Sequence, residues 1–423
     1  MKLLQQVRVI DPVRQVDLLA DVSIANGKIE QIGDRLSDYP AETEIIAPSG
    51  LVLGTGLVDL YSHSGEPGNE SRETLLDLAR AGAAGGFTQI GILPDTSPRT
   101  NNLATITAIK NKSRFLSTQG DCQLQLPQLN FWGSAWDESG QTMNALAELQ
   151  PEVVGFTTNH NLSNLNILKQ ILEYAQPWSP TIAISIHHNE LGSNGVVREG
   201  EVALRHGMAG SPSYAESAAI AAVLEMAAAI PVKIHLMRVS TKRGVELIAD
   251  AKSRGVNVTA STTWMHLLWN SEALGSYDPN LRLDPPLGNE SDRQTLATGV
   301  RQGIIDAIAI DHQAYTYEEK TVAFALAPPG AIGLEIALPL LWQKFVATGE
   351  WTAIELWQAL SSRPRQCLQQ EAHEIAPEQN ADLVLFDPKK TWIGDRDNFK
   401  SPATNSPWYS REIIGKVVET WMN

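Results

Sequence analysis

GLVDLYSHSGEPG, residues 56–68, is the stretch of this sequence that points most directly to its fold. It begins with a largely apolar run, Leu57 to Leu60, and ends in a turn of polar residues, glycine and proline around His63. An apolar strand that ends in polar residues is typical of a parallel barrel, in which active-site residues follow the carboxyl ends of the strands. The stretch therefore predicts a barrel strand that ends at a functional rim.

The same alternation continues along the chain. Apolar runs of strand length take turns with segments of helical periodicity, which indicates βα units. Eight such units fit a (β/α)8 barrel of the TIM type over residues 51–375. A doubly wound open sheet is the alternative, and the lack of a glycine-rich loop after the first strand weighs against it. The predicted strands end near His63, Asp95, Ala135, Thr158, His187, Val239, Thr263 and Asp311, and the predicted helices include Arg72–Ala84, Leu162–Tyr174, Tyr214–Ala229, Thr241–Ser253 and Ile332–Val346.

Short strand-like segments occupy both ends of the chain. Asp21 to Ile24 runs through Asn26-Gly27 into Lys28 to Ile32, which is a hairpin pattern. Further strand-like segments lie at Ala381 to Asp387 and near the C-terminus. We therefore predict a small β domain formed by residues 1–50 together with residues 376–423.

The composition limits the classes of partner. The net charge of -15 disfavours nucleic acid and acidic membrane surfaces. The two cysteines, Cys122 and Cys367, are far apart and suit a reducing compartment. The first twelve residues show no signal peptide pattern, and no apolar run approaches the ~20 residues of a membrane span. We expect a cytoplasmic protein.

Residues 56–68 resemble the Asp-x-His-x-His-x-Arg-x-Pro-Gly frame of dihydroorotases, in the amidohydrolase superfamily. The resemblance extends over nearly the whole chain. It implies a barrel of the amidohydrolase type and a role in pyrimidine biosynthesis. Its further frames are Gly85-Gly86-Phe87-Thr88 with Leu93-Pro94-Asp95-Thr96, Val258-Thr259-Ala260-Ser261, Asp284-Pro285-Pro286-Leu287, Ile310-Asp311-His312, Ala327-Pro328-Pro329-Gly330 and Asn405-Ser406-Pro407.

Three positions keep the residues that the resemblance assigns to the metals. His63 matches the second histidine of the first frame, and His187 matches the histidine after the fifth barrel strand. Asp311 matches the aspartate after the eighth strand, which in the family binds metal and moves the proton of the attacking water. We expect these three residues to be remnants of a metal site.

Other ligand positions are substituted. Tyr61 stands for the first histidine, Arg238 for a later one, and Thr158 with Asn159 for the bridging acid. Arginine stays protonated in proteins and repels a cation, and tyrosine is a poor ligand for zinc. We therefore expect no cofactor; zinc is the metal implied if the chain is active. We also predict that Arg238 contacts Asp311, directly or through one water, or failing that Asp95.

The substrate positions differ as well. The family holds the carboxylate of dihydroorotate with an arginine, an asparagine and a histidine, and the matching residues are Gly65, Asp95 and Tyr315. Loss of one charged clamp costs roughly 2–5 kcal/mol, and Asp95 adds repulsion toward an anion.

Together these substitutions predict a dihydroorotase homologue without catalysis that acts as a scaffold or assembly partner. Some degenerate relatives of this kind associate with aspartate carbamoyltransferase, so the resemblance implies that partner and a homo- or hetero-oligomer. The alternative is an active cyclic amidohydrolase with an altered or mononuclear metal site and a non-anionic substrate. Metal content separates the two hypotheses, because the family's reaction needs a metal-activated water.

Overall fold

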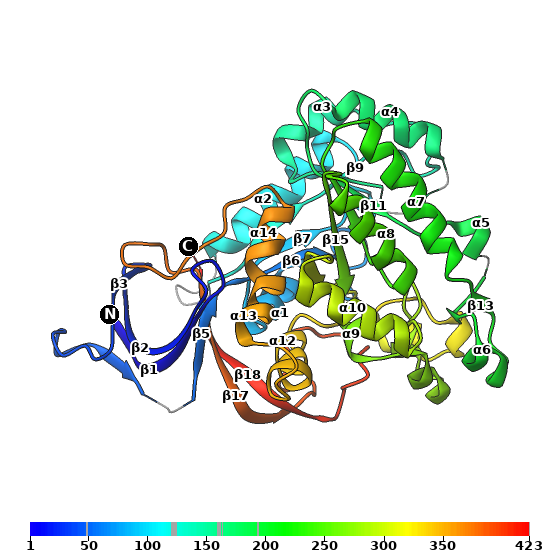
Figure 1. The fold of residues 1–423 in the computed structure, drawn as a ribbon. Helices are drawn as coiled ribbons and strands as arrows, with labels where there is room; N and C mark the ends of the chain where they lie inside the picture. The colour runs from blue at the N-terminus through cyan, green and yellow to red at the C-terminus, as the bar shows by residue number, and fades with distance from the viewer. Residues whose placement is uncertain (48–49, 120–124, 159–161, 163, 193, 423) are drawn as a thin grey trace.

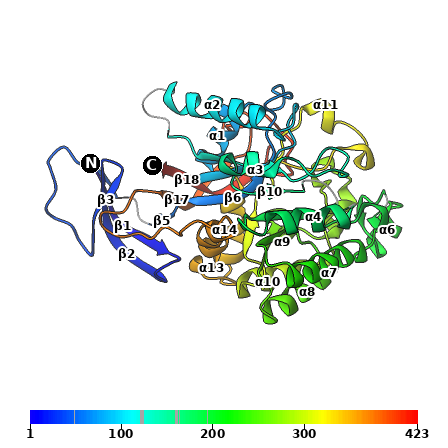
Figure 2. The ribbon, with the colours of Figure 1, turned by 90° about the horizontal axis from the view of Figure 1, so that it is seen from above.

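A computed structural model describes residues 1–47, 50–119, 125–158, 162, 164–192 and 194–422. It contains a barrel of parallel strands surrounded by helices, and a sheet that projects from one side of the barrel (Figures 1 and 2). The predicted barrel with a small β domain built from both chain ends is confirmed. Among the described residues, no helix combines the length and the apolar character that a membrane span requires.

Parallel strands form the barrel wall. Across the described ranges, nine labelled strands occupy eight wall positions, because only Trp132 separates β8 from β9. Backbone hydrogen bonds close the wall between the first and last strands, from Asp311 N to Tyr61 O (3.1 Å) and from His63 N to His312 O (2.8 Å). The strands are β6 (Leu57–Ser62), β7 (Phe87–Ile92), β8 (Gln128–Phe131), β9 (Gly133–Ser134), β10 (Phe156–Thr157), β11 (Ile182–Ser185), β14 (Ile234–Met237), β15 (Val258–Thr263) and β16 (Ala307–Ala309).

Small and medium apolar side chains fill part of the inside of the wall. Leu60 and Met237 lie in one buried cluster with Ala183, Ala307 and Ala309. Such layers make the interior of an eight-stranded barrel a packed core and leave its carboxyl end as the place for a site.

Helices cover the outside of the wall. Side-chain caps define several starts: the Thr74 hydroxyl accepts from Asp77 N at the start of α1, and Asn289 caps α10 in the same way. The main covering helices are α1 (Leu75–Ala84), α2 (Leu103–Gln119), α4 (Leu165–Ala175), α7 (Tyr214–Ala229), α8 (Lys242–Ser253), α10 (Glu290–Gln302), α12 (Ala337–Leu341) with the π-helix η5 (Trp342–Val346), and α13 (Ala353–Trp357) with the π-helix η6 (Gln358–Ser362) and α14 (Arg363–Cys367).

Shorter elements occupy the connections between strands and helices. They are α3 (Leu146–Leu149), η1 (Gln150–Glu152), α5 (Asn189–Gly192), β12 (Val197–Arg198), α6 (Glu201–Arg205), β13 (Gly210–Ser211), α9 (Trp264–Leu268), η2 (Ser271–Ser276), η3 (Pro279–Leu281), α11 (Tyr317–Lys320) and η4 (Phe324–Leu326). Most of them follow the carboxyl ends of the barrel strands, and α9 contributes residues to the site described below.

The projecting sheet joins the two ends of the chain. Its order is β18-β17-β5-β1-β2-β3, with β4 paired to β1. The turn between β2 and β3 has positive φ at Asn26 (52°) and Gly27 (71°), as a two-residue hairpin requires. The sheet includes β5, which lies after residue 50. Its strands are β1 (Lys2–Asp11), β2 (Val16–Ala25), β3 (Lys28–Gly33), β4 (Glu44–Ile46), β5 (Val52–Thr55), β17 (Leu383–Ile393) and β18 (Glu412–Trp421).

Candidate functional site

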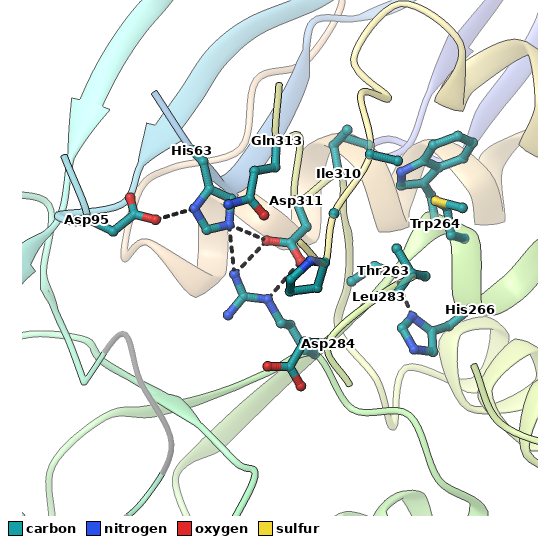
Figure 3. A pocket seen from close by; sticks show the side chains of 15 residues that line it. His63, Asp95, Thr263, Trp264, His266, Leu283, Asp284, Ile310, Asp311 and Gln313 are labelled. Carbon is teal, nitrogen blue, oxygen red and sulfur yellow. Dashed lines mark hydrogen bonds and ion pairs between the residues drawn. The ribbon is translucent and has the colours of Figure 1, made fainter. Parts of the chain in front are cut away.

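A cavity of about 180 Å³ opens at the carboxyl end of the barrel strands (Figure 3). We call it the central pocket. Side chains that follow β6, β7, β14, β15 and β16 converge there, as the barrel architecture requires. Its lining residues are His63, Asp95, Arg238, Thr263, Trp264, Met265, His266, Leu283, Asp284, Ile310, Asp311, Gln313, Pro329, Gly330 and Ala331.

The centre of the pocket is an ion pair between Arg238 and Asp311. Arg238 Nε donates to Asp311 Oδ2 at 2.7 Å, and Arg238 Nη2 donates to Asp311 Oδ1 at 2.6 Å. The arrangement is bidentate, which is the strong form of an arginine–carboxylate contact. The two side chains are only 10% and 18% exposed, so the surroundings screen the pair weakly. The contact predicted from the strand ends is confirmed.

His63 extends this pair to a second carboxylate. Its Nδ1 bonds to Asp95 Oδ2, and its Nε2 lies 3.3 Å from Asp311 Oδ1. Burial opposes the charge on His63, but the two carboxylates outweigh burial and raise its pKa to about 9. At neutral pH both ring nitrogens therefore carry protons and donate to Asp95 and Asp311. Arg238 Nη2, 3.3 Å from His63 Nε2, is then a neighbouring cation.

The charges of this network are balanced within the protein. Burial disfavours the charged carboxylate of Asp311, yet Arg238 and His63 outweigh it and hold its pKa well below the usual range. Burial likewise opposes ionised Asp95, and His63 lowers its pKa on balance. Two cations and two carboxylates thus alternate, with a fixed guanidinium supplying positive charge at the strand ends.

These residues do not fit a metal centre. The guanidinium of Arg238 lies within hydrogen-bonding distance of both His63 and Asp311, the two retained ligand positions that line the pocket. A bound cation would have to displace it or lie against a group that never deprotonates in proteins. In the part of the chain that the structure describes, no three His, Cys, Asp or Glu side chains are arranged to hold a metal ion.

Tyr61 contacts Arg238 through its hydroxyl group and its ring. Its ring is fully buried, and its hydroxyl accepts a hydrogen bond from Arg238 N at 3.1 Å and lies 2.9 Å from Ser261 Oγ. The guanidinium carbon lies 5.2 Å from the centre of the ring. Ser261 Oγ lies in turn 2.9 Å from His235 Nε2. Burial lowers the pKa of His235 to about 3, so this histidine is neutral and structural.

The backbone at the central pair is unusual. Arg238 has φ of 57° and Asp311 has φ of 53°, both in the left-handed region. That conformation costs a non-glycine residue on the order of 1–3 kcal/mol and persists where the surroundings impose it. The surrounding fold therefore imposes the backbone conformation of both Arg238 and Asp311.

His187 is not brought together with His63 and Asp311. It is not among the residues that line the central pocket, and its ring packs against Gly192. A Cβ added at Gly192 would lie 2.1 Å from His187 Nε2. Burial is the main cause that lowers the pKa of His187. The structure therefore joins two of the three retained ligand positions.

The bridging position carries no acid in the described part of the chain. Thr158 is buried, and its hydroxyl accepts from Ser185 N at 3.2 Å while its carbonyl accepts from Trp136 Nε1 at 2.6 Å. Thr158 thus serves the packing of neighbouring strands. Asn159, the second residue of this position, lies outside the described residues.

The three predicted substrate positions either leave no room for a side chain or bond to other protein groups. At Gly65, an added Cβ would lie 2.4 Å from the carbonyl oxygen of Glu73 and 2.7 Å from that of Asn69, so no side chain fits there. Asp95 bonds to His63. The Tyr315 hydroxyl donates to Pro329 O at 3.0 Å, and Tyr315 is not among the residues that line the central pocket. These three residues do not form a carboxylate clamp.

Sequence patterns did not single out every polar side chain that lines the pocket. Asp284 and Gln313 border the central pocket, and the frame around Asp284 was recognised without a role for its side chain. Ser261 was recognised only as the last residue of the frame Val258-Thr259-Ala260-Ser261. Its link between Tyr61 and His235 depends on which side chains point into the barrel, which requires the strand register.

The sequence matches the family described as dihydro-orotase-like over residues 50–244. A probable dihydroorotase-like protein of Synechocystis sp. is 40% identical, with 98% of each chain covered. The dihydroorotase of Syntrophus aciditrophicus is 32% identical over 99% of this chain and 97% of its own. Among solved structures, an L-hydantoinase from Arthrobacter aurescens superposes with a TM-score of 0.83 at 20% identity, covering 100% of this chain and 96% of the other.

The structural match shows that the chain shares the fold of this hydantoinase, and at this identity it shows the fold alone. The sequence matches reach further, because they run from end to end at 32–40% identity with proteins of one family. From the shared frames, the shared fold and these relatives, the chain belongs to the dihydroorotase-like family.

Proposed function

We propose that this chain is a catalytically inactive member of its family that acts as a scaffold or assembly partner. The observation that carries the proposal is the bidentate contact of Arg238 with Asp311. The family's reaction requires a metal-activated water, and Asp311 is the residue that the resemblance assigns to that water. Here both oxygens of Asp311 accept hydrogen bonds from a permanent cation.

The substrate side of the pocket supports the same proposal. Dihydroorotate is an anion, and the pocket is lined by three carboxylates, Asp95, Asp284 and Asp311, against the two cations His63 and Arg238. Both cations already face protein carboxylates. Binding of an anionic substrate would therefore break internal pairs without a free clamp to replace them.

The proposed partner is aspartate carbamoyltransferase from the same cell, a protein of the same pathway. The support is the resemblance to degenerate relatives that associate with this enzyme. The net charge of -15 favours a partner with a basic surface, because complementary charge speeds encounter. In this role the barrel is kept for its outer or rim surface.

Metal analysis beside a dihydroorotate assay tests the proposal. The purified chain is expected to contain well under one equivalent of zinc and to show no hydrolysis above a heat-inactivated control. His63→Ala is the matched variant, and it should change neither result. Stoichiometric zinc that survives dialysis, disappears in His63→Ala and accompanies turnover would overturn the proposal in favour of an active hydrolase with an altered metal site.

A further inference from the structure

Three segments that contact one another lie on the side of the barrel that carries α6 and α11. We call them together the rim ridge and define it as residues 199–206, 271–282 and 316–326. Both α6 and α11 lie at the end of the molecule opposite the projecting sheet (Figure 2). The ridge contains short elements connected by loops, so its shape depends on contacts between side chains and backbone.

Specific contacts join its three segments. Arg205 bonds to Glu272 at 3.0 Å, and the rings of His206 and Tyr277 meet edge to face with centroids 5.6 Å apart. The buried Lys320 donates to Pro279 O at 3.1 Å, which fastens the third segment to the second. The three segments therefore form one connected surface.

Large apolar side chains project from this surface. Leu204 is 85% exposed, Leu326 is 79% exposed and Tyr317 is 70% exposed, which are the three highest values among the large hydrophobic residues that the structure describes. Tyr277 and Val322 add two more exposed side chains on the same ridge, at 46% and 41%. Single exposed apolar residues are ordinary, but such a concentration marks an interaction surface.

The exposed charges of the ridge are mostly negative. Glu199, Glu201, Glu272 and Glu318 are exposed. Within the three described segments, Arg205 is the exposed base, and it is paired with both Glu201 and Glu272. A surface of this kind repels a second copy of itself and attracts a partner that carries lysine or arginine beside an apolar recess.

We propose that the rim ridge is the docking surface for a protein partner that presents an apolar recess bordered by basic side chains. This assignment rests on the proposed scaffold function and adds the surface and the chemistry of the partner to it. Leu204, Tyr317 and Leu326 are the anchors that enter the recess, and the four glutamates face its basic border.

Binding to aspartate carbamoyltransferase, measured by gel filtration with light scattering and by titration, tests the assignment. The variants are Leu204→Ser with Leu326→Ser, and separately Tyr317→Ser. Leu19→Ser is the matched control, because Leu19 is 60% exposed on β2 of the projecting sheet, away from the ridge. Exposed positions tolerate serine, and circular dichroism checks that each variant is folded.

The ridge variants are expected to weaken the complex at least tenfold, while Leu19→Ser leaves the dissociation constant within twofold. Glu318→Lys should slow association and reduce its dependence on salt. If the wild-type complex forms and the ridge variants bind as well as the wild type, the ridge assignment is wrong and the scaffold function stands. If the wild-type chain forms no complex, the scaffold function fails and the ridge assignment falls with it.

Discussion

Arg238 is the residue on which the account depends. Its side chain offers a planar, permanently charged group at a position that the resemblance matches to a family histidine, and the left-handed backbone at residue 238 holds it toward Asp311. A contact between the two could be predicted from sequence, because both follow barrel strands and strand ends meet at one rim. The hydrogen bonds that link Tyr61 to Ser261 and to Arg238 N could not be predicted, because they depend on the register of the barrel strands.

Substitution of Arg238 should destabilise the fold. Arg238→Met leaves Asp311 with its carboxylate largely buried and one partner fewer, so we expect a loss of about 2–4 kcal/mol in the free energy of unfolding. A second substitution, Asp311→Asn, should recover part of that loss. Urea unfolding measures both.

The control for this prediction is an exposed pair of the same geometry. Arg8 donates from Nε to Asp17 Oδ1 at 2.7 Å, and these side chains are 39% and 27% exposed. Arg8→Met should cost no more than about 1 kcal/mol, because solvent screens the charges. Equal losses at Arg8 and Arg238 would remove the argument that the central pair is a special feature of the pocket.

His63 should make stability depend on pH. Its folded-state pKa is raised to about 9 from an ordinary value of 6.5. The stabilisation by its positive charge is therefore complete below about pH 6.5 and is lost as the pH rises through about 9, a change of roughly 1–3 kcal/mol. The wild type minus His63→Gln difference in unfolding free energy should shrink over that window. A difference that stays constant from pH 6 to 9.5 contradicts the protonated state assigned here.

At the scale of elements, the sequence predicted the barrel strands and the helices α1, α4, α7 and α8, while α2 and α10 were not among the helices named. The helix expected over Tyr214–Ala229 is observed with those bounds, and the strand of residues 56–68 ends at Ser62, beside His63. The helix expected from Ile332 begins only at Ala337. The preceding residues instead surround the buried His312, whose Nδ1 accepts from Gly333 N at 3.2 Å, and that tertiary contact has no periodic signal.

The turn after β6 gives a prediction about Gly65. Because a Cβ there would meet two carbonyl oxygens, Gly65→Arg should destabilise the chain by more than 2 kcal/mol and should not create a carboxylate clamp. Gly33→Ala is a suitable control, since its Cβ would meet only the end of the Leu36 side chain, at 3.3 Å. A stable Gly65→Arg variant that binds dihydroorotate would show that this turn can open.

Repair of single positions should fail because catalysis depends on the site as a unit. Tyr61→His supplies one imidazole and leaves Arg238 and Gly65 as they are, so no turnover of dihydroorotate is expected. The same substitution also removes the hydroxyl that bonds to Ser261 and Arg238 N. Measurable hydrolysis by this single variant would mean that the pocket still accommodates a working metal.

For the whole molecule, the fold class was predictable because strand and helix periodicity alternate over residues 51–375 and strand patterns occupy both chain ends. The rim ridge was not, because α6, η2, η3 and η4 are elements of three to six residues without a repeating apolar pattern. A dihydroorotase-like barrel whose pocket pairs Arg238 with Asp311 fits the proposed scaffold, because a fold can persist while its site changes.

The central claim is that the chain works as a scaffold without catalysis, and substitution of the retained ligand positions tests it most directly. The triple variant His63→Ala, His187→Ala and Asp311→Ala should be measured, once shown to be folded, for assembly with aspartate carbamoyltransferase and for its function in the cell. The account predicts that both are retained, because none of these three residues belongs to the rim ridge. A folded triple variant that has lost the cellular function would contradict the scaffold and make a cryptic activity the better explanation.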